Sequence, residues 1–258
     1  MSYEHTVEYL SDKVRARIVA DDDPINPCVD YDQFGKMVCF HSRYNLGHET
    51  PKCDSLDYLI GLASDVLPDG VESLARKYRE PGESWDDASY MRDYELRCRI
   101  ESDPDKLHKV IDAHFLMLPL YLYDHSGLTM RTSAFSCPWD SSQVGFVFAS
   151  KADTIREFGK GGRLTAKARQ DAFDLMAAEV KNYDDYLTGN CWGFVVEVFD
   201  GDEWKNVDSC WGFLGDPDYC LTEGKAVAQH AATRIADADA SEFAAMTMAQ
   251  RPDMYPNG

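Results

Sequence analysis

The sequence lacks any hydrophobic run long enough to cross a membrane. A transmembrane helix needs about 20 consecutive apolar residues, and no segment of the 258 residues approaches that length. The N-terminal segment, MSYEHTVEYLSDKVRAR, also lacks the apolar core of a secretory signal peptide. These two absences predict a cytoplasmic protein that does not bind membranes.

Motifs for the common metal and phosphate sites are also missing. The eight cysteines include no CxxC pair, and the histidines include no pair at the i, i+4 spacing of a HExxH helix. The glycine-rich segment 159–163, GKGGR, lacks the GxxxxGK[ST] frame of a P-loop. We therefore expect no metal site and no cofactor, and we expect the cysteines to be buried, reduced thiols.

Positive charge is scarce, and the formal net charge is −19. Residues 184–223 carry ten acidic side chains and a single basic one, so this segment alone contributes −9. Such a surface repels nucleic acid, so direct DNA or RNA binding is not expected, whereas a basic protein partner would be attracted. Four residues represent this candidate partner-binding face: Asp200, Asp202, Glu203 and Asp208.

The apolar pattern predicts an α+β fold. A hydrophobic content of 44% excludes general disorder. Because predicted strands meet mainly through hairpins and helices arrive in blocks, we expect a mostly antiparallel sheet with helices on one side. Strands are expected at 36–42, 115–123, 128–136 and 144–149, and as a hairpin at 194–199 and 204–213.

The expected organisation has three parts. Residues 1–30 are interpreted as a peripheral segment, residues 31–236 as a single domain and residues 237–258 as a tail. Helical spacing of apolar residues predicts a helical insertion at about 54–114, with its third helix over 85–101. Further helices are expected over 165–187 and 222–236. The oligomeric state is left open.

Three predicted turns carry more polar and aromatic side chains than a turn needs. A guanidinium binds phosphate or carboxylate through two parallel hydrogen bonds, and Trp or Tyr rings stack on bases. The three turns therefore predict a polar pocket for a nucleotide-like ligand. Its candidate residues are His41, Arg43, Tyr44 and Asn45; Asp124, His125 and Ser126; and Trp139, Asp140, Ser141 and Gln143.

Catalysis is an alternative interpretation of the same turns. Asp124 and His125 would form an acid-oriented base, with Cys137 or Ser141 as nucleophile. Neighbouring residues of a strand point to opposite faces, so Asp124 orients His125 only if the turn intervenes. No nucleophile elbow or papain-type cysteine motif is present. We therefore assign no catalytic residue and keep a small nucleotide hydrolase as an alternative.

Two short segments near the acidic stretch resemble each other. Cys191-Trp192-Gly193-Phe194 and Cys210-Trp211-Gly212-Phe213 each place a large ring beside a glycine. They are expected to be cross-strand partners in which glycine relieves crowding, and a duplicated binding motif is the alternative.

Three segments carry a resemblance to a known family: GKMVCFHSRYNLGHE at 35–49, LYLYDHSGLTMRTSAFSCPWDSSQVGFVF at 120–148 and DSCWGFLGD at 208–216. They resemble an uncharacterised family of proteins encoded by bacteriophages and other mobile elements. The resemblance implies an accessory protein that acts in the host bacterial cytoplasm.

Accessory genes of mobile elements often counter host defence, and this analogy sets the functional expectation. We expect a non-enzymatic anti-defence factor that binds a nucleotide-like ligand, or a host defence component, through its polar pocket. The alternative based on charge is an acidic protein that imitates DNA and blocks the nucleic-acid site of a host defence protein.

Overall fold

The computed structural model describes residues 4–84, 93–137 and 139–249. Within these ranges the strands form two four-stranded sheets, and neighbouring strands pair antiparallel. With the connecting helices, this is the α+β class that the sequence predicts. The chain divides into two compact units: a terminal unit of residues 1–25 and 189–258, and a central unit of residues 26–188.

This division differs from the single domain of residues 31–236 expected from the sequence. Residues 4–20 were expected to be peripheral, but they form two strands of the terminal-unit sheet. The expected tail begins at residue 237, but the last helix continues through Ala249. The first of these strands pairs with the second, and the second pairs with a segment after residue 190, and no local pattern in a sequence reports so distant a pairing.

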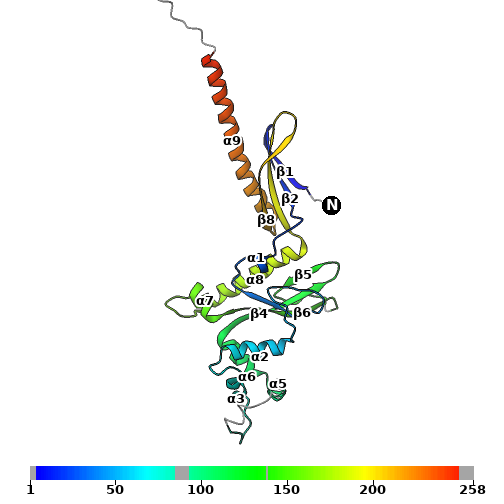
Figure 1. Ribbon diagram of the computed structural model, residues 1–258, viewed down its shortest axis with the longest axis vertical. Helices are drawn as coiled ribbons and strands as arrows, with labels where there is room; N and C mark the ends of the chain where they lie inside the picture. The colour runs from blue at the N-terminus through cyan, green and yellow to red at the C-terminus, as the bar shows by residue number, and fades with distance from the viewer. Residues whose placement is uncertain (1–3, 85–92, 138, 250–258) are drawn as a thin grey trace, which may run out of the picture. The chain divides into compact units, whose positions relative to one another are not determined.

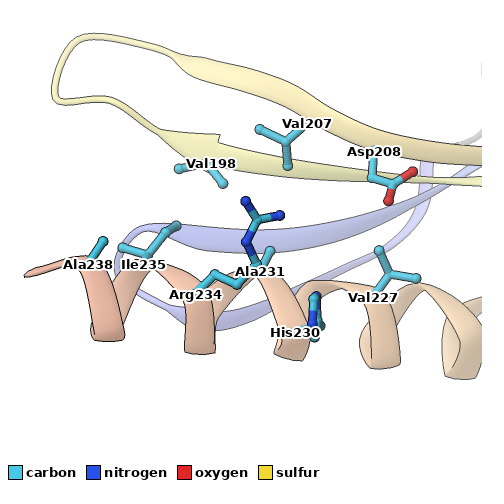
Figure 2. Close-up of a pocket in the computed structure, with 9 residues that line it drawn as sticks. All are labelled: Val198, Val207, Asp208, Val227, His230, Ala231, Arg234, Ile235 and Ala238. Atoms are coloured by element: carbon cyan, nitrogen blue, oxygen red, sulfur yellow. The ribbon is translucent and has the colours of Figure 1, made fainter.

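The terminal unit is a twisted sheet with one long helix on one face (Figures 1 and 2). Apolar side chains alternate along β2 and β7, so one face of each strand packs against the helix. Val14, Ala16 and Ile18 of β2 are at most 1% exposed. The sheet order is β1-β2-β7-β8, and the elements are β1 (Glu4–Ser11), β2 (Val14–Ala20), β7 (Cys191–Phe199), β8 (Trp204–Leu214) and α9 (Pro217–Ala249).

The two similar Cys-Trp-Gly-Phe segments lie on β7 and β8 and face each other, as predicted. Trp192 pairs with Phe213, and Phe194 pairs with Cys210. Gly193 lies against the indole of Trp211, and a Cβ at this position would come within 2.2 Å of a ring carbon. The prediction that glycine relieves crowding beside a large ring is therefore confirmed.

The central unit contains the second sheet, of order β3-β6-β4-β5, and the remaining helices. Its strands are β3 (Lys36–Cys39), β4 (Phe115–Asp124), β5 (Leu128–Arg131) and β6 (Ser141–Ser150). Its helices are α1 (Pro27–Asp30), α2 (Ser55–Asp65), α3 (Val71–Lys77), α5 (Asp93–Ser102), α6 (Asp105–His114), α7 (Lys151–Phe158) and α8 (Ala166–Thr188).

Helices cover both faces of the central-unit sheet, which corrects the expectation of helices on one side (Figure 1). Val147 of β6 joins a core with Met176 and Val180 of α8. Its neighbours Phe146 and Phe148 join a separate core with the helices of the insertion. Successive residues of a strand point to opposite faces, so the continuous apolar run of β6 supplies both cores.

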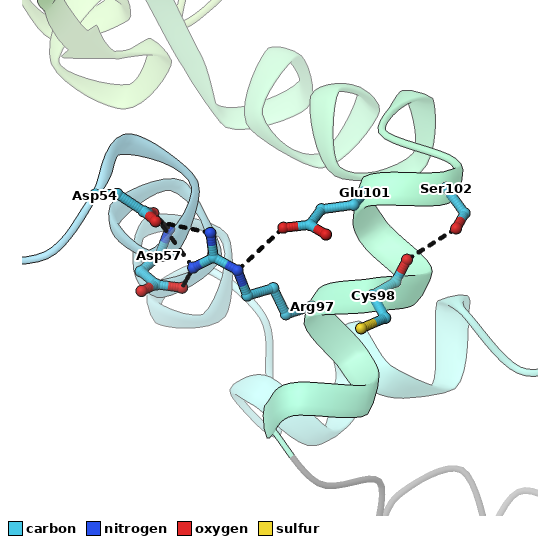
Figure 3. A network of polar contacts seen from close by, with 6 residues as sticks. All are labelled: Asp54, Asp57, Arg97, Cys98, Glu101 and Ser102. Carbon is cyan, nitrogen blue, oxygen red and sulfur yellow. Dashed lines mark hydrogen bonds and ion pairs between the residues drawn. The ribbon is translucent and has the colours of Figure 1, made fainter.

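The helical insertion is tied together by an arginine on α5 (Figure 3). Arg97 contacts Asp54 at 2.7 Å, Asp57 at 2.5 Å and Glu101 at 3.1 Å. Asp54 also caps α2 by accepting the N–H of Asp57. The guanidinium lowers the pKa of the Asp54 carboxyl, so α5 is held against the first turn of α2 by charge as well as by apolar packing.

Several element boundaries differ from the sequence prediction. β5 ends at Arg131 instead of residue 136, and β6 begins at Ser141 instead of residue 144. The predicted helix over 85–101 corresponds to α5 from Asp93, while residues 85–92 lie outside the described residues. Among the described helices, none combines the length and apolar character that crossing a bilayer requires.

Candidate functional site: a polar recess in the central unit

A small polar recess lies at one end of the central-unit sheet. Its volume is 260 Å³. The end of β4, the start of β6 and the residues after β3 meet there, because β6 runs antiparallel to both of its neighbours. The recess is lined by His41, Leu122, Asp124, Trp139, Asp140, Ser141 and Ser142.

Backbone pairing between β4 and β6 positions the residues that these strands contribute to the recess. Leu122 pairs with Ser142 across β4 and β6, and the N–H of Asp124 donates to the carbonyl of Asp140 at 2.9 Å. The predicted loop 139–143 is therefore partly strand, because Ser141 and Gln143 belong to β6. Gln143 is exposed and donates from Nε2 to the carbonyl of Gly145 at 3.4 Å, so it does not line the recess.

His41 is held by its own loop. Its Nδ1 accepts the backbone N–H groups of Arg43 and Tyr44, both at 3.2 Å. Its ring stacks on Tyr44 with a centroid distance of 5.0 Å and an interplanar angle of 17°. Because Nδ1 acts as an acceptor, the neutral imidazole carries its proton on Nε2 and offers that N–H as a donor.

Arg43 partly balances the acidic character of the recess. Its Nη1 lies 3.5 Å from Asp124 Oδ2 and donates to the Tyr44 hydroxyl at 3.3 Å. The side chain is 71% exposed, so the guanidinium lies in solvent beside the recess. Arg43 thus pairs with one of the two carboxylates that line the recess, Asp124 and Asp140, and the recess favours a ligand that donates hydrogen bonds.

The segment between β5 and β6 presents an aromatic ring at the edge of the recess. Trp139 is 91% exposed. The neighbouring turn is closed by two bonds: Ser141 Oγ donates to the Cys137 carbonyl at 2.5 Å, and the Cys137 thiol donates to Asp140 at 3.5 Å. An exposed indole beside carboxylates is suited to stacking on a flat ring whose edge carries N–H groups.

The structure brings five of the predicted ligand-binding residues into the lining of the recess, and the others lie outside it. His125 and Ser126 are exposed at the β4–β5 turn, where Ser126 has a φ of +59° and the His125 N–H donates to the Gly127 carbonyl. Asn45 is exposed in its loop. Arg43 and Tyr44 contact lining residues instead of lining the recess themselves.

The predicted acidic face is less uniform than its composition indicates. Asp200 lies 2.5 Å from Lys205 Nζ, and its other oxygen accepts the N–H groups of Asp202 and Glu203. These bonds lower the pKa of the Asp200 carboxyl, with the Lys205 bond contributing most. Glu203 also lies 3.8 Å from Lys205. These residues therefore stabilise the β7–β8 turn.

Some polar residues that the sequence analysis missed hold the central unit together. The buried carboxylate of Glu179 on α8 accepts the N–H groups of Phe34 and Gly35 at 2.6 and 2.8 Å. Burial raises its pKa, although the two backbone bonds act in the opposite direction. The Tyr183 hydroxyl accepts the N–H of Gly47 at 2.9 Å. Neither residue stands in a motif, so the sequence gives no signal for them.

The cysteines follow the expectation in part. Four are buried: Cys28, Cys39, Cys191 and Cys220. Burial raises the pKa of the Cys28 and Cys39 thiols to about 12, so these two remain unreactive. Cys53 and Cys210 are exposed. In the described part of the chain, no three His, Cys, Asp or Glu side chains cluster as a metal site does.

Comparisons with protein-family models, with curated proteins and with solved structures give no match for this chain.

Proposed function

We propose that the chain is a non-enzymatic accessory protein of a phage or mobile element that binds the base of a nucleotide-like host signal in the recess. The observation that carries this proposal is the arrangement of the exposed Trp139 indole beside Asp124, Asp140 and His41. A base stacked on the indole places its exocyclic amine near the carboxylates. The sequence resemblance supplies the biological setting.

The size of the recess limits what it holds. Small-molecule pockets usually measure about 300–1,000 Å³, and 260 Å³ is below this range. The recess therefore suits one ring, while sugar and phosphate remain outside. Arg43 lies in solvent at its edge and is placed to contact such a phosphate.

Binding is favoured over turnover because the groups that catalysis needs are already engaged. Ser141 Oγ donates to a backbone carbonyl, and His41 Nδ1 accepts two backbone N–H groups. Asp124 lies beside Arg43, and His125 is at the exposed turn. A hydrolase would need a nucleophile whose proton is taken by a base within hydrogen-bond reach.

Isothermal titration with nucleotides tests the proposal. We expect adenine, guanine or cytosine nucleotides, including cyclic ones, to bind more tightly than uridine nucleotides, which lack an exocyclic amine. Trp139→Ala should weaken binding at least about fivefold, because stacking contributes about 1–3 kcal/mol per base. Asp140→Asn should weaken it less, because an acceptor oxygen remains.

The matched control is Tyr94→Ala, which removes another exposed aromatic side chain, on α5, and should leave the affinity unchanged. Absence of binding by every nucleotide tested would contradict the proposal, as would unchanged affinity in Trp139→Ala.

A further inference from the structure

A second cavity lies within the terminal unit, between α9 and the β7–β8 hairpin. Its volume is 450 Å³, which is within the usual range for small-molecule sites. Its walls are mainly aliphatic. The lining side chains that the argument uses are Val198 and Val207 of the hairpin and Val227, Arg234, Ile235 and Ala238 of α9.

Apolar surface remains uncovered at this groove. Val207 is 54% exposed although it is aliphatic. β8 is the edge strand of its sheet, and residues 205–211 are exposed along it. The helix and the hairpin therefore leave an apolar trough open instead of closing it with side chains of their own.

One cation projects into this trough. Figure 2 shows Arg234 extending from α9 toward the hairpin, with its guanidinium ending below Val207. Among the described residues, none forms a hydrogen bond or ion pair with Arg234. The other charged or titratable groups of the lining are His230 of α9 and Asp208 of β8. A guanidinium that emerges among aliphatic side chains complements an anionic head attached to an apolar body.

We propose that this groove binds an amphipathic anion, an aliphatic carboxylate whose head pairs with Arg234 and whose chain lies against the valines and Ile235. The net negative charge of the protein favours an anion that also has an apolar body over one that has charge alone. At a net charge of −19 the surface as a whole repels anions, so a carboxylate is retained only where a cation and apolar contacts act together. This site is separate from the recess of the central unit and does not depend on its ligand.

Titration of the full chain with sodium decanoate, below its micelle concentration, tests this proposal by calorimetry. We expect one decanoate per chain. Arg234→Gln should weaken binding about tenfold, since a charge-assisted pair is lost. The same substitution should leave the affinity for 1-decanol unchanged, because this ligand has the chain without the charge.

Two further variants locate the site. Ala238→Trp places a large ring in the groove from an exposed position and should abolish binding of both ligands. Arg169→Gln removes an exposed arginine from α8 and should bind decanoate as the unchanged chain does. Thermal unfolding of each variant checks that it is folded.

Failure of decanoate to bind the unchanged chain would overturn the proposal, and so would equal decanoate affinity in Arg234→Gln. Trp139→Ala should bind decanoate normally, so this result and the nucleotide result are independent.

Discussion

At the scale of single residues, the central unit depends on polar side chains that bind backbone groups far away in the sequence. Glu179 holds residues 34 and 35, and Tyr183 holds residue 47. His48 acts over a shorter distance and accepts the Met37 N–H through Nδ1 at 2.9 Å. Leaving a buried N–H without its acceptor lowers the stability of the folded state by about 1–3 kcal/mol. Each of these side chains therefore stabilises the position of the backbone segment that it binds.

His48 makes stability depend on pH. Burial, assisted by the charge of Lys36, lowers its pKa below the ordinary value of 6.5. The unfolded chain therefore binds the proton first, and the stabilisation is complete above about pH 6.5 and is lost as the pH falls from there toward the lowered value.

We expect the free energy of unfolding, measured with urea between pH 7.5 and 5.5, to decrease more steeply for the unchanged chain than for His48→Asn. Asparagine keeps an acceptor near the Nδ1 position but does not titrate. His108→Asn, at an exposed position of α6, is the control and should keep the slope. Equal slopes for the unchanged chain and His48→Asn would refute this account.

The residues of the recess were partly predictable from the sequence for a physical reason. A turn needs few residue types, so a surplus such as His41 or Trp139 is visible without a structure. Which of these side chains meet is decided by strand register. His125 is one residue beyond Asp124 but lies at the exposed turn, and Ser142 was missed because serine is unremarkable beside a predicted turn.

At the scale of elements, the continuous apolar run 144–149 explains both the success and the error of the fold prediction. The run correctly indicated a strand. It also indicates that helices cover both faces of the sheet, because a strand with apolar residues on both faces must be buried on both sides. The helices at 54–114 and at 165–187 were identified separately, and this signal places them on opposite faces of the sheet.

Two glycines of the central unit differ in the space around them, and an alanine substitution at each tests that difference. A Cβ at Gly145 of β6 would come within 1.9 Å of the Val38 carbonyl oxygen, whereas Gly61 in α2 has no neighbouring atom within 4 Å. Gly145→Ala should therefore reduce the free energy of unfolding by about 1–3 kcal/mol, because β3 must move away.

Gly61→Ala is the matched substitution in an open helix interior. It should increase stability by up to about 1 kcal/mol, because alanine favours a helix. Urea unfolding of both variants gives the comparison. A Gly145→Ala protein as stable as the parent chain would show that β3 and β6 do not approach this closely.

At the scale of the whole molecule, each unit has its own apolar core. Two core clusters lie entirely within residues 26–188, and a third lies entirely within the terminal unit. The expected limit of the N-terminal segment at residue 30 lies close to the observed boundary after residue 25, whereas the second boundary, after residue 188, was not expected from the sequence. The division arises from strand pairing between distant segments, which local composition does not report.

Independent cores predict that the central unit folds alone. A fragment of residues 26–188 should unfold cooperatively in urea and bind the same nucleotide as the full chain. A fragment of residues 31–236 is the control: it contains β7 without its partner β2 and should expose apolar surface and aggregate. Non-cooperative unfolding of the 26–188 fragment would contradict the assignment of two units.

The pairing of β2 with β7 has a consequence for how the protein forms during synthesis. Ala20 pairs with Trp192, and the Asp21 N–H donates to the Cys191 carbonyl at 2.8 Å, so the ribosome must complete the whole central unit between two strands that lie side by side. An isolated hairpin such as β1–β2 is marginally stable in water. Closing a loop costs entropy that grows with its flexible length, and a central unit that has already folded shortens that flexible length. The order of translation thereby sets the order of folding: the segment made in the middle folds first, and the strands made before it wait for those made after it.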